Sequence, residues 1–319
     1  MRKILVTGAL GQIGSELTMG LRKIYGYDNV VASSRRKKEG FDNIYDSGVF
    51  EIIDVRDAKA MADIVKRHKV NTIVHLAAVV SAVGEQNPAL AWDIDINGLY
   101  NVLEVAREEN ATVFTPSSIA VFGPSTPKDN TPQDTIQRPT TMYGVAKVAG
   151  ELLCDYYHRR FGLDTRGVRF PGVISYETLP GGGTTDYAVH IYYEALKNKK
   201  YSSFIDKGTK MDMMYMPDAL NAITQLLEAD PSKLIHRNSF NVTAMGFAPE
   251  EVAASIKKVI PGFEIDYDVD PIRQAIAESW PNSIDDTAAR KEWGWHPEYD
   301  LDGMTKDMLE KLTIKLGIK

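Results

Sequence analysis

The chain has 319 residues, of which 44% are hydrophobic, and this is enough for one large α/β unit with a substantial core. The formal net charge of −6 gives no general attraction to phosphate backbones or anionic membranes, so we expect no nucleic-acid partner. Only one cysteine, Cys154, is present, so no intramolecular disulfide can form, and the first predicted strand begins at Lys3; both features favour a cytoplasmic protein without a signal peptide.

Neither a membrane segment nor a metal site is expected. The longest strongly apolar stretch, residues 72–80, is far shorter than the roughly 20 residues that span a bilayer. The six histidines are scattered, without a His-x-x-x-His or Cys-x-x-Cys pair that could hold zinc. Cys154 lies in an apolar helical stretch and is interpreted as a packed side chain.

The first half of the chain alternates short β-branched runs with longer amphipathic stretches. The predicted strands cover residues 3–9, 29–34, 50–55, 72–78, 112–118 and 165–170. The predicted crossover helices cover residues 12–25, 58–69, 88–109 and 142–161. Right-handed βαβ units in this order predict an α/β fold, a doubly wound parallel Rossmann sheet, over residues 1–172.

The pattern is less regular in the second half, where it predicts a smaller α+β lobe. Helices are expected over 217–229 and 248–260, and short strands over 239–244 and 264–269. We therefore assign residues 173–319 mainly to a substrate-binding lobe, with room for some segments to return to the Rossmann domain. Ligands of doubly wound folds bind beyond the carboxyl ends of the strands, so these ends are the candidate site.

A glycine-rich turn follows the first predicted strand. In "VTGALGQIG" the glycines Gly8, Gly11 and Gly14 open a helix, with Gln12 and Ile13 between them. Without side chains, the backbone can approach a pyrophosphate, whose charge the helix N-terminus favours. Tight βα turns also need glycine, but this position in a run of βαβ units favours dinucleotide binding.

The ends of the next strands supply further candidates for cofactor contacts. The third strand ends at Asp54 and Val55, where an adenine could rest, although a solvated strand-end aspartate is an equally good interpretation. The fourth ends at Leu76, Ala77 and Ala78, small enough to lie under a cofactor or simply to pack tightly, and Ser81 follows.

A serine, tyrosine and lysine set suggests acid–base chemistry. The fifth strand ends at Ser117 and Ser118, and Tyr143 and Lys147 follow in "YGVAK". Residues four apart share a helix face, so the ammonium can stabilise the phenolate as a general base, while a serine hydroxyl orients the same substrate oxygen. A second Tyr-x-x-x-Lys pair, at residues 193 and 197, follows no serine-ended strand and is interpreted as coincidental.

Taken together, "TGALGQIG", "SSIAVFG" and "YGVAK" resemble the extended short-chain dehydrogenase/reductase superfamily, which also holds nucleotide-sugar 4-epimerases. Three segments of the second half resemble L-threonine 3-dehydrogenases of the short-chain type: "PGVISYETLPGGGTTDYAV" (171–189), "MMYMPDA" (213–219) and "ESWPNSIDDTAARKEWGW" (278–295). The resemblance covers nearly the whole chain.

This resemblance implies oxidation of L-threonine at its β-carbon to L-2-amino-3-oxobutanoate, with hydride passing to a nicotinamide dinucleotide. Tyr143 would be the general base, Lys147 would tune it and bind the nicotinamide ribose, and Ser118 would polarise the hydroxyl oxygen. The implied substrate contacts are Ser81, Ser117, Gly183, Thr185 and Trp280. The glycines at 181–183 could offer backbone amides to a carboxylate, or could merely form a mobile turn.

The resemblance also implies a homodimer. The helices at 88–109 and 142–161 would pack against their copies, with Leu99, Val102 and Leu103 near that surface.

The choice between NAD and NADP depends on "VVASSRRKK", residues 30–38. NAD-preferring folds carry an acidic residue about 20 positions beyond the glycines, and the resembled family uses NAD with an aspartate there. This chain has Ser34 followed by Arg35. Serine removes repulsion of a 2′-phosphate and the guanidinium can pair with it, so we expect NADP to be accepted, although these basic residues could also be a solvated loop beside an NAD site.

Two other functions remain open. A nucleotide-sugar 4-epimerase or dehydratase would share the serine, tyrosine and lysine but would need space for a second nucleotide. A dinucleotide-sensing protein would bind the cofactor without turnover and would not need the complete Ser118, Tyr143 and Lys147 set.

Overall fold

The computed structural model describes residues 2–179 and 181–318. Its centre is a six-stranded parallel sheet in the order β3-β2-β1-β4-β5-β7. The strands are β1 (Ile4–Thr7), β2 (Val30–Ser34), β3 (Phe50–Ile52), β4 (Thr72–His75), β5 (Thr112–Phe114) and β7 (Thr165–Arg166). The chain order reverses between β1 and β4, which is the crevice where such folds bind dinucleotides. The predicted doubly wound fold is confirmed.

Two of the predicted strands are each divided between two sheets, which the sequence pattern did not indicate. Residues 112–118 form β5 and then β6 (Ser117–Ser118), and residues 165–170 form β7 and then β8 (Val168–Phe170). The second parts pair with each other and with β12 (Phe240–Asn241) in a separate three-stranded sheet. Pro116 has no N–H for a ladder, and a Cβ at Gly167 would lie 2.4 Å from the carbonyl oxygen of Thr115. The break turns Ser117 and Ser118 away from the main sheet.

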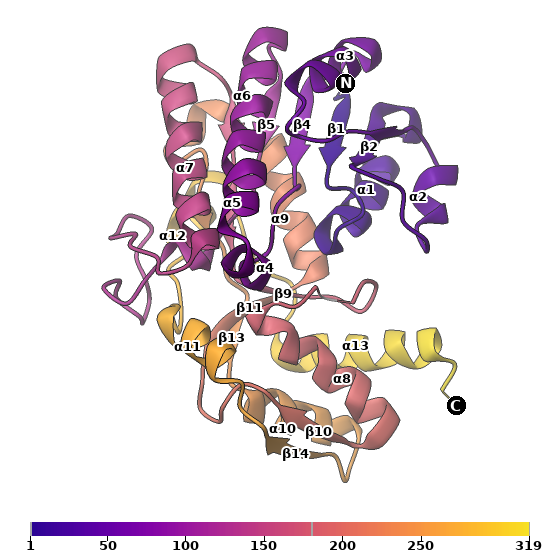
Figure 1. Cartoon of the computed structure of the whole chain (residues 1–319). Coiled ribbons are helices and arrows are strands. Elements are labelled where there is room, and N and C mark those ends of the chain that lie inside the picture. Colours follow the sequence, from indigo (N-terminus) through magenta and orange to yellow (C-terminus); the bar gives the residue numbers. More distant parts are fainter. Residues whose placement is uncertain (1, 180, 319) are drawn as a thin grey trace.

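Helices cover both faces of the central sheet (Figure 1). On one face, α1 (Gln12–Tyr25) packs beside α9 (Met216–Glu228) through leucines and alanines such as Leu17 and Ala222. On the other face lie α3 (Ala58–His68), α6 (Gly98–Glu109) and α7 (Met142–Phe161). Short helices α2 (Asp42–Asp46) and α4 (Ser81–Gln86) follow β2 and β4.

The helix expected over residues 88–109 is built from three parts. A short α5 (Pro88–Ala91) continues into a π-helical segment, η2 (Trp92–Asn97), and then into α6. Single π-helical turns are rare and occur often at functional sites. This one packs against α7, the helix that carries Tyr143 and Lys147.

The second half forms a lobe below the carboxyl ends of β1 and β4 (Figure 1). Its strands are β9 (Gly172–Ile174), β11 (Met211–Tyr215) and β13 (Met245–Phe247) in one sheet and β10 (Lys200–Ser203) and β14 (Glu264–Tyr267) in another. Its helices are α8 (Tyr187–Asn198), α10 (Pro249–Val259), α11 (Pro271–Ser279) and α13 (Leu301–Leu316). No helix in the described part of the chain is long and apolar enough to cross a membrane.

Some segments beyond residue 172 lie in the Rossmann part of the molecule. Helix α9 packs on α1, and β12 pairs with β8. Helix α12 (Thr287–Trp293) contacts β12. The division predicted from the sequence left room for such returns, and residues 217–229 and 239–244 are two of them, because their apolar faces complete the core on α1 and β8.

Candidate active site

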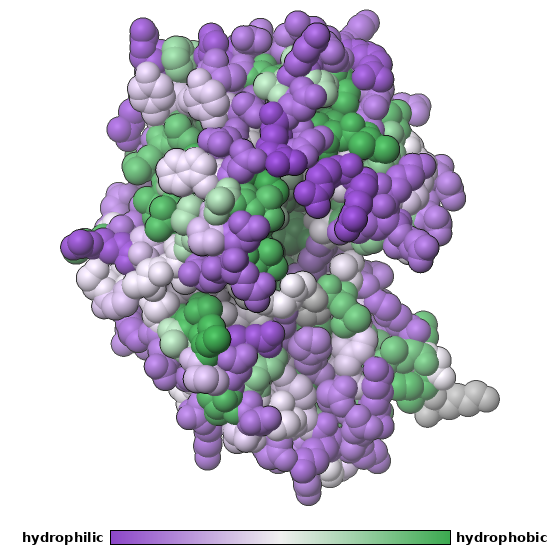
Figure 2. Space-filling view, viewed as in Figure 1, coloured by the Kyte–Doolittle hydropathy of each residue, from purple (hydrophilic) through white to green (hydrophobic). Residues whose placement is uncertain are grey.

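Two adjoining cavities lie at the carboxyl ends of the parallel strands, and Figure 2 shows this side hollowed between the two parts of the molecule. We call the first the dinucleotide cleft. Its lining includes nine of the predicted cofactor residues: Gly8, Gly11, Ser34, Arg35, Asp54, Val55, Leu76, Ala77 and Ala78. The structure thus brings together residues that lie up to 70 positions apart in the sequence.

The glycine-rich turn has the form that close approach of a pyrophosphate requires. Gly8 has a φ of +72°, and a Cβ there would lie 2.7 Å from the backbone nitrogen of Ala77. A Cβ at Gly14 would lie 2.2 Å from the carbonyl oxygen of Gly8. Side chains at either position would push the first helix away from the sheet, so the turn fits a dinucleotide.

The rim of the dinucleotide cleft is basic. Arg35, Arg36 and Lys38 line it, and Asp54 is the one acidic side chain among its described lining residues. Arg56 donates two side-chain hydrogen bonds to Asp54, at 2.9 and 2.7 Å, and these bonds lower the pKa of Asp54 to about 2. The Asp54 carboxylate is therefore ionised and already paired, which leaves the basic rim without an opposing free carboxylate.

We call the second cavity the substrate cavity, and it has a volume of about 200 Å³. It adjoins the first, since Val80 lines both. Its lining includes ten of the predicted site residues: Gln12, Ile13, Ser81, Ser117, Ser118, Tyr143, Lys147, Gly183, Thr185 and Trp280. Gly14 lines neither cavity, because it is buried at the start of α1.

Tyr143 and Lys147 lie on one face of α7, which begins where Thr141 caps its first turn with a hydrogen bond from Gly144 N (3.1 Å). The Nζ of Lys147 is 5.4 Å from the centroid of the Tyr143 ring and donates a hydrogen bond to the carbonyl oxygen of Pro116 (2.8 Å). Ser118 Oγ accepts a hydrogen bond from Ala120 N (3.2 Å), and its own proton remains available to a ligand.

The second Tyr-x-x-x-Lys pair lies elsewhere. Tyr193 is buried in the core of the lobe, and its hydroxyl donates to the carbonyl oxygen of Tyr176 (3.3 Å). Neither Tyr193 nor Lys197 lines the two cavities. The preference for Tyr143 and Lys147 is consistent with this placement.

Ser117 belongs to a buried ion-pair network. Its hydroxyl donates to Glu151 Oε1 (2.5 Å), and Arg169 pairs with both oxygens of Glu151, each at 2.9 Å. Both charged side chains are only 7% exposed. A hydroxyl held in this way can still accept a hydrogen bond from a substrate, but it would have to leave Glu151 to donate one. Glu151 was not among the residues predicted from the sequence, although it lies four residues after Lys147 on the same helix face.

The glycine loop at 181–183 is also engaged internally. The carboxylate of Asp186 accepts hydrogen bonds from Gly182 N (2.8 Å) and Gly183 N (2.6 Å). Burial raises the pKa of Asp186, while these amide bonds act in the opposite direction. Two of the amides that we expected to be open to a substrate carboxylate are therefore occupied by one from the chain itself. The sequence analysis did not single out Asp186.

The predicted dimer residues are misplaced. Leu99, Val102 and Leu103 are at most 4% exposed, because they form the face of α6 that packs on the sheet. The apolar side chains that do reach the surface of these helices include Tyr100, Leu152 and Tyr156, which are 48%, 60% and 55% exposed. Among the described residues there is also no group of three or more side chains that could hold a metal ion.

Known proteins are similar to this chain over nearly its whole length. Residues 4–243 match the model of the NAD dependent epimerase/dehydratase family. A protein of Staphylococcus aureus called an uncharacterized epimerase/dehydratase is 58% identical over 319 residues, covering 100% of this chain and 99% of that one. The solved structure of the L-threonine dehydrogenase of Clostridium difficile is 66% identical, with a TM-score of 0.97, over 99% of this chain and 98% of that one.

A third relative has been solved in two forms. The GalE-like L-threonine dehydrogenase of Cupriavidus necator has a TM-score of 0.94 in its holo form, at 46% identity over 97% of this chain and 99% of that one. Its apo form has a TM-score of 0.84, at 43% identity over 98% of this chain and 100% of that one. The resemblance to the short-chain L-threonine 3-dehydrogenases is thereby confirmed, and the chain belongs to the NAD-dependent epimerase/dehydratase family.

Proposed function

We propose that this chain oxidises L-threonine at its β-carbon to L-2-amino-3-oxobutanoate, with a nicotinamide dinucleotide as hydride acceptor. The observation that carries the proposal is the position of Tyr143, Lys147 and Ser118 in a small cavity that adjoins the dinucleotide cleft. The overall similarity to the L-threonine dehydrogenases of Clostridium difficile and Cupriavidus necator supports the same activity.

The chain's own groups would act as follows. Tyr143 takes the proton of the substrate hydroxyl as that carbon becomes a carbonyl. Lys147 keeps a positive charge beside the Tyr143 ring and favours its phenolate form. Ser118 donates a hydrogen bond to the same substrate oxygen and holds it toward Tyr143. A bound nicotinamide dinucleotide supplies hydride acceptance.

The remaining lining residues would orient the amino acid. Ser81 and Trp280 are only 7% and 8% exposed. They come from distant parts of the sequence, Ser81 from the start of α4 and Trp280 from the end of α11. Thr185 offers a hydroxyl and Gly183 a backbone carbonyl, since the Gly183 amide is bonded to Asp186. We propose these four as the substrate contacts, with Ser117 in a supporting role because its hydroxyl is paired with Glu151.

For the cofactor, we propose that NADP is accepted and is preferred over NAD. Ser34 leaves no carboxylate at the end of β2, and Arg35 and Arg36 line the cleft next to it. Asp54, the other nearby carboxylate, is paired with Arg56. A 2′-phosphate would therefore meet guanidinium groups and no free negative charge.

We also propose a homodimer formed by α6 and α7. Both helices cover one side of the Rossmann part (Figure 1), and the side chains of Tyr100, Leu152 and Tyr156 are exposed on them. Light scattering at micromolar concentration should give twice the mass of 35.5 kDa, and Leu152→Glu should reduce it to one chain. A wild-type monomer at that concentration would rule the dimer out.

The activity is tested with a panel of substrates and both cofactors. L-threonine should give a reduced nicotinamide and a product that loses carbon dioxide to form aminoacetone. UDP-glucose and UDP-galactose should not be interconverted. Interconversion without threonine oxidation would establish the nucleotide-sugar epimerase instead, and cofactor binding without any turnover would establish a dinucleotide sensor.

A further inference from the structure

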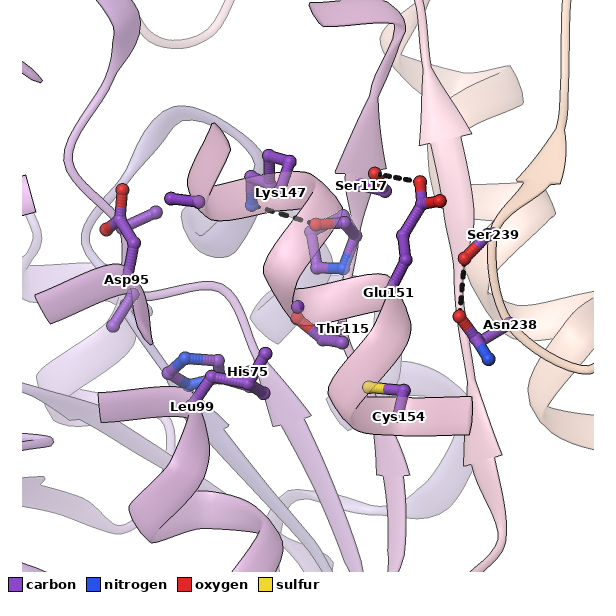
Figure 3. A pocket seen from close by; sticks show the side chains of 15 residues that line it. His75, Asp95, Leu99, Thr115, Ser117, Lys147, Glu151, Cys154, Asn238 and Ser239 are labelled. Carbon is purple, nitrogen blue, oxygen red and sulfur yellow. Dashed lines mark hydrogen bonds between the residues drawn. The ribbon is translucent and has the colours of Figure 1, made fainter. Parts of the chain in front are cut away.

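A third, small polar cavity lies behind Lys147; it shares Ala77 and Ala78 with the dinucleotide cleft and Ser117 and Lys147 with the substrate cavity. It has a volume of about 20 Å³, enough for one water molecule. Figure 3 shows Asp95 and His75 at one side of it, Glu151 and Cys154 at the other, and Lys147 between them near the top. The proposed function assigns no role to most of these polar side chains.

Asp95 is the unusual member of this group. It lies in the π-helical segment η2 and is 7% exposed. Its Oδ1 accepts a hydrogen bond from Val79 N (2.7 Å), whereas its Oδ2 is buried and has no hydrogen-bond partner in the described part of the chain. A buried carboxylate oxygen without a partner costs free energy, and native proteins usually satisfy such atoms with a protein group or an ordered water.

Lys147 faces the same cavity. Its ammonium carries three protons, of which one is donated to the carbonyl oxygen of Pro116 (2.8 Å). Burial raises the pKa of Asp95 to about 6, and both the Val79 hydrogen bond and the charge of Lys147 act against this rise. The two groups therefore attract each other, although Asp95 Oδ2 makes no hydrogen bond to Lys147 or to another described residue.

The other titratable groups that face the cavity are already accounted for. Burial lowers the pKa of His75 to about 3, so its ring is neutral, and its Nδ1 is 2.8 Å from Thr7 Oγ1. Burial raises the pKa of the Cys154 thiol, which is therefore neutral too. Glu151 is paired with Arg169. Among these lining groups, Asp95 is the charge left to balance Lys147.

We propose that Asp95 is a positioning residue for Tyr143 and Lys147: its carboxylate holds the Lys147 ammonium through one water molecule in this cavity. The water would accept a proton of Lys147 and donate one to Asp95 Oδ2, so that both gain a hydrogen bond. The charge of Asp95 would then keep the ammonium beside the Tyr143 ring. The catalytic consequence rests on the proposed threonine oxidation, whereas the contact itself does not.

The first test is the pH dependence of kcat/KM for threonine in Asp95→Asn. Asparagine keeps the size and the acceptor for Val79 N but lacks the charge. Because Asp95 ionises as the pH rises through about 6, the activity that depends on it should be present above that pH and lost below it. We expect Asp95→Asn to lower kcat/KM about tenfold or more at pH 8 and to remove this ionisation from the acidic limb.

Asp218→Asn is the matched control. Asp218 is also fully buried and accepts backbone hydrogen bonds from Glu298 N (2.8 Å) and Tyr299 N (3.2 Å), but it lines none of the three cavities described here. It should keep the wild-type pH profile. A wild-type rate and profile in Asp95→Asn would overturn the proposal.

The second test needs neither cofactor nor turnover. Carbon-13 NMR of aspartate-labelled protein follows the titration of Asp95, whose signal is identified by its loss in Asp95→Asn. In Lys147→Met the midpoint should move to higher pH, since the cation that favours the carboxylate is gone. An unmoved midpoint would overturn the contact. A wild-type protein that fails to oxidise threonine but shows this shift would contradict the proposed function alone.

Discussion

The dinucleotide cleft and the substrate cavity adjoin each other but are assembled differently. The lining of the cleft runs from Thr7 to Ile94 and comes from successive βα turns of one parallel sheet. The lining of the substrate cavity runs from Gln12 to Trp280 and draws on both halves of the chain. The carboxyl ends of parallel strands meet at one edge of a sheet, so the lining of the cleft follows from the order of strands and helices along the chain. The lining of the substrate cavity depends in addition on how the smaller lobe packs against that edge.

The two cavities also use charge differently. The rim of the cleft carries the basic side chains of Arg35 and Arg36, which suits a phosphate-rich ligand. In the substrate cavity the lining carboxylate of Asp186 is bonded to the glycine loop, and Ser117 of the same lining is bonded to Glu151, which is paired with Arg169. Substitutions in one cavity should therefore affect one ligand and leave the other unchanged, and four predictions test this separation.

The largest effect is expected for Tyr143→Phe. Removing the phenol oxygen should lower kcat for threonine oxidation by about 10²–10⁴-fold, because the general base is lost. The dissociation constant of the cofactor, measured by calorimetry, should stay close to that of the wild type, since the glycine-rich turn is untouched.

Tyr193→Phe is the control for that change. Its hydroxyl donates to the backbone carbonyl of Tyr176 and lines neither cavity, so turnover should persist. If Tyr143→Phe kept most of its activity while Tyr193→Phe lost it, the wrong pair would have been chosen.

The next effect concerns the cleft alone. Ser34→Asp combined with Arg35→Ile should reverse the preference for NADP over NAD, changing the ratio of their kcat/KM values by about tenfold or more, because the new carboxylate repels a 2′-phosphate. The KM for threonine should hardly change. The wild-type enzyme could instead favour NAD, with a ratio of kcat/KM values that the double substitution does not change. That result would show that the basic residues are only a solvated loop.

The sequence allowed the cleft to be predicted well because its signals are local. Gly8, Gly11 and the residues that end each strand are recognisable from spacing and from their place in the βα order. Glu151 and Asp95 escaped prediction because their partners Arg169 and Val79 lie 18 and 16 residues away in the sequence. Asp186 escaped because only the folded loop shows that its carboxylate turns back to Gly182 and Gly183. The broken strands at Pro116 and Gly167 were missed for a similar reason, since the two breaks face each other only in the folded sheet.

A smaller effect is expected for Asp186→Ala, which should act on the substrate cavity alone. Loss of the two amide contacts frees the loop at Gly182 and Gly183, so the KM for threonine should rise about tenfold, as for the loss of hydrogen bonds to a charged group. Cofactor affinity should be unchanged. Asp206→Ala, an exposed aspartate in the same lobe, serves as the control. A changed cofactor affinity with an unchanged KM for threonine would show that Asp186 supports the dinucleotide cleft and not the substrate cavity.

The smallest effect concerns mobility rather than rate. The chain fits the holo form of the Cupriavidus necator enzyme more closely than its apo form, with TM-scores of 0.94 and 0.84. We expect the amides of 181–186 to exchange with solvent more slowly when threonine is added to the cofactor complex. Hydrogen exchange read by mass spectrometry checks this. Equal protection with and without threonine would argue against closure over the substrate.

The transfer of hydride from the β-carbon of threonine is tested most directly with L-threonine that carries deuterium at that carbon. Mass spectrometry of the cofactor after a single turnover should find one deuterium in the reduced nicotinamide, and Tyr143→Phe should leave the cofactor oxidised. Reduced cofactor without deuterium, or deuterium that stays in the amino acid product, would contradict the proposed reaction.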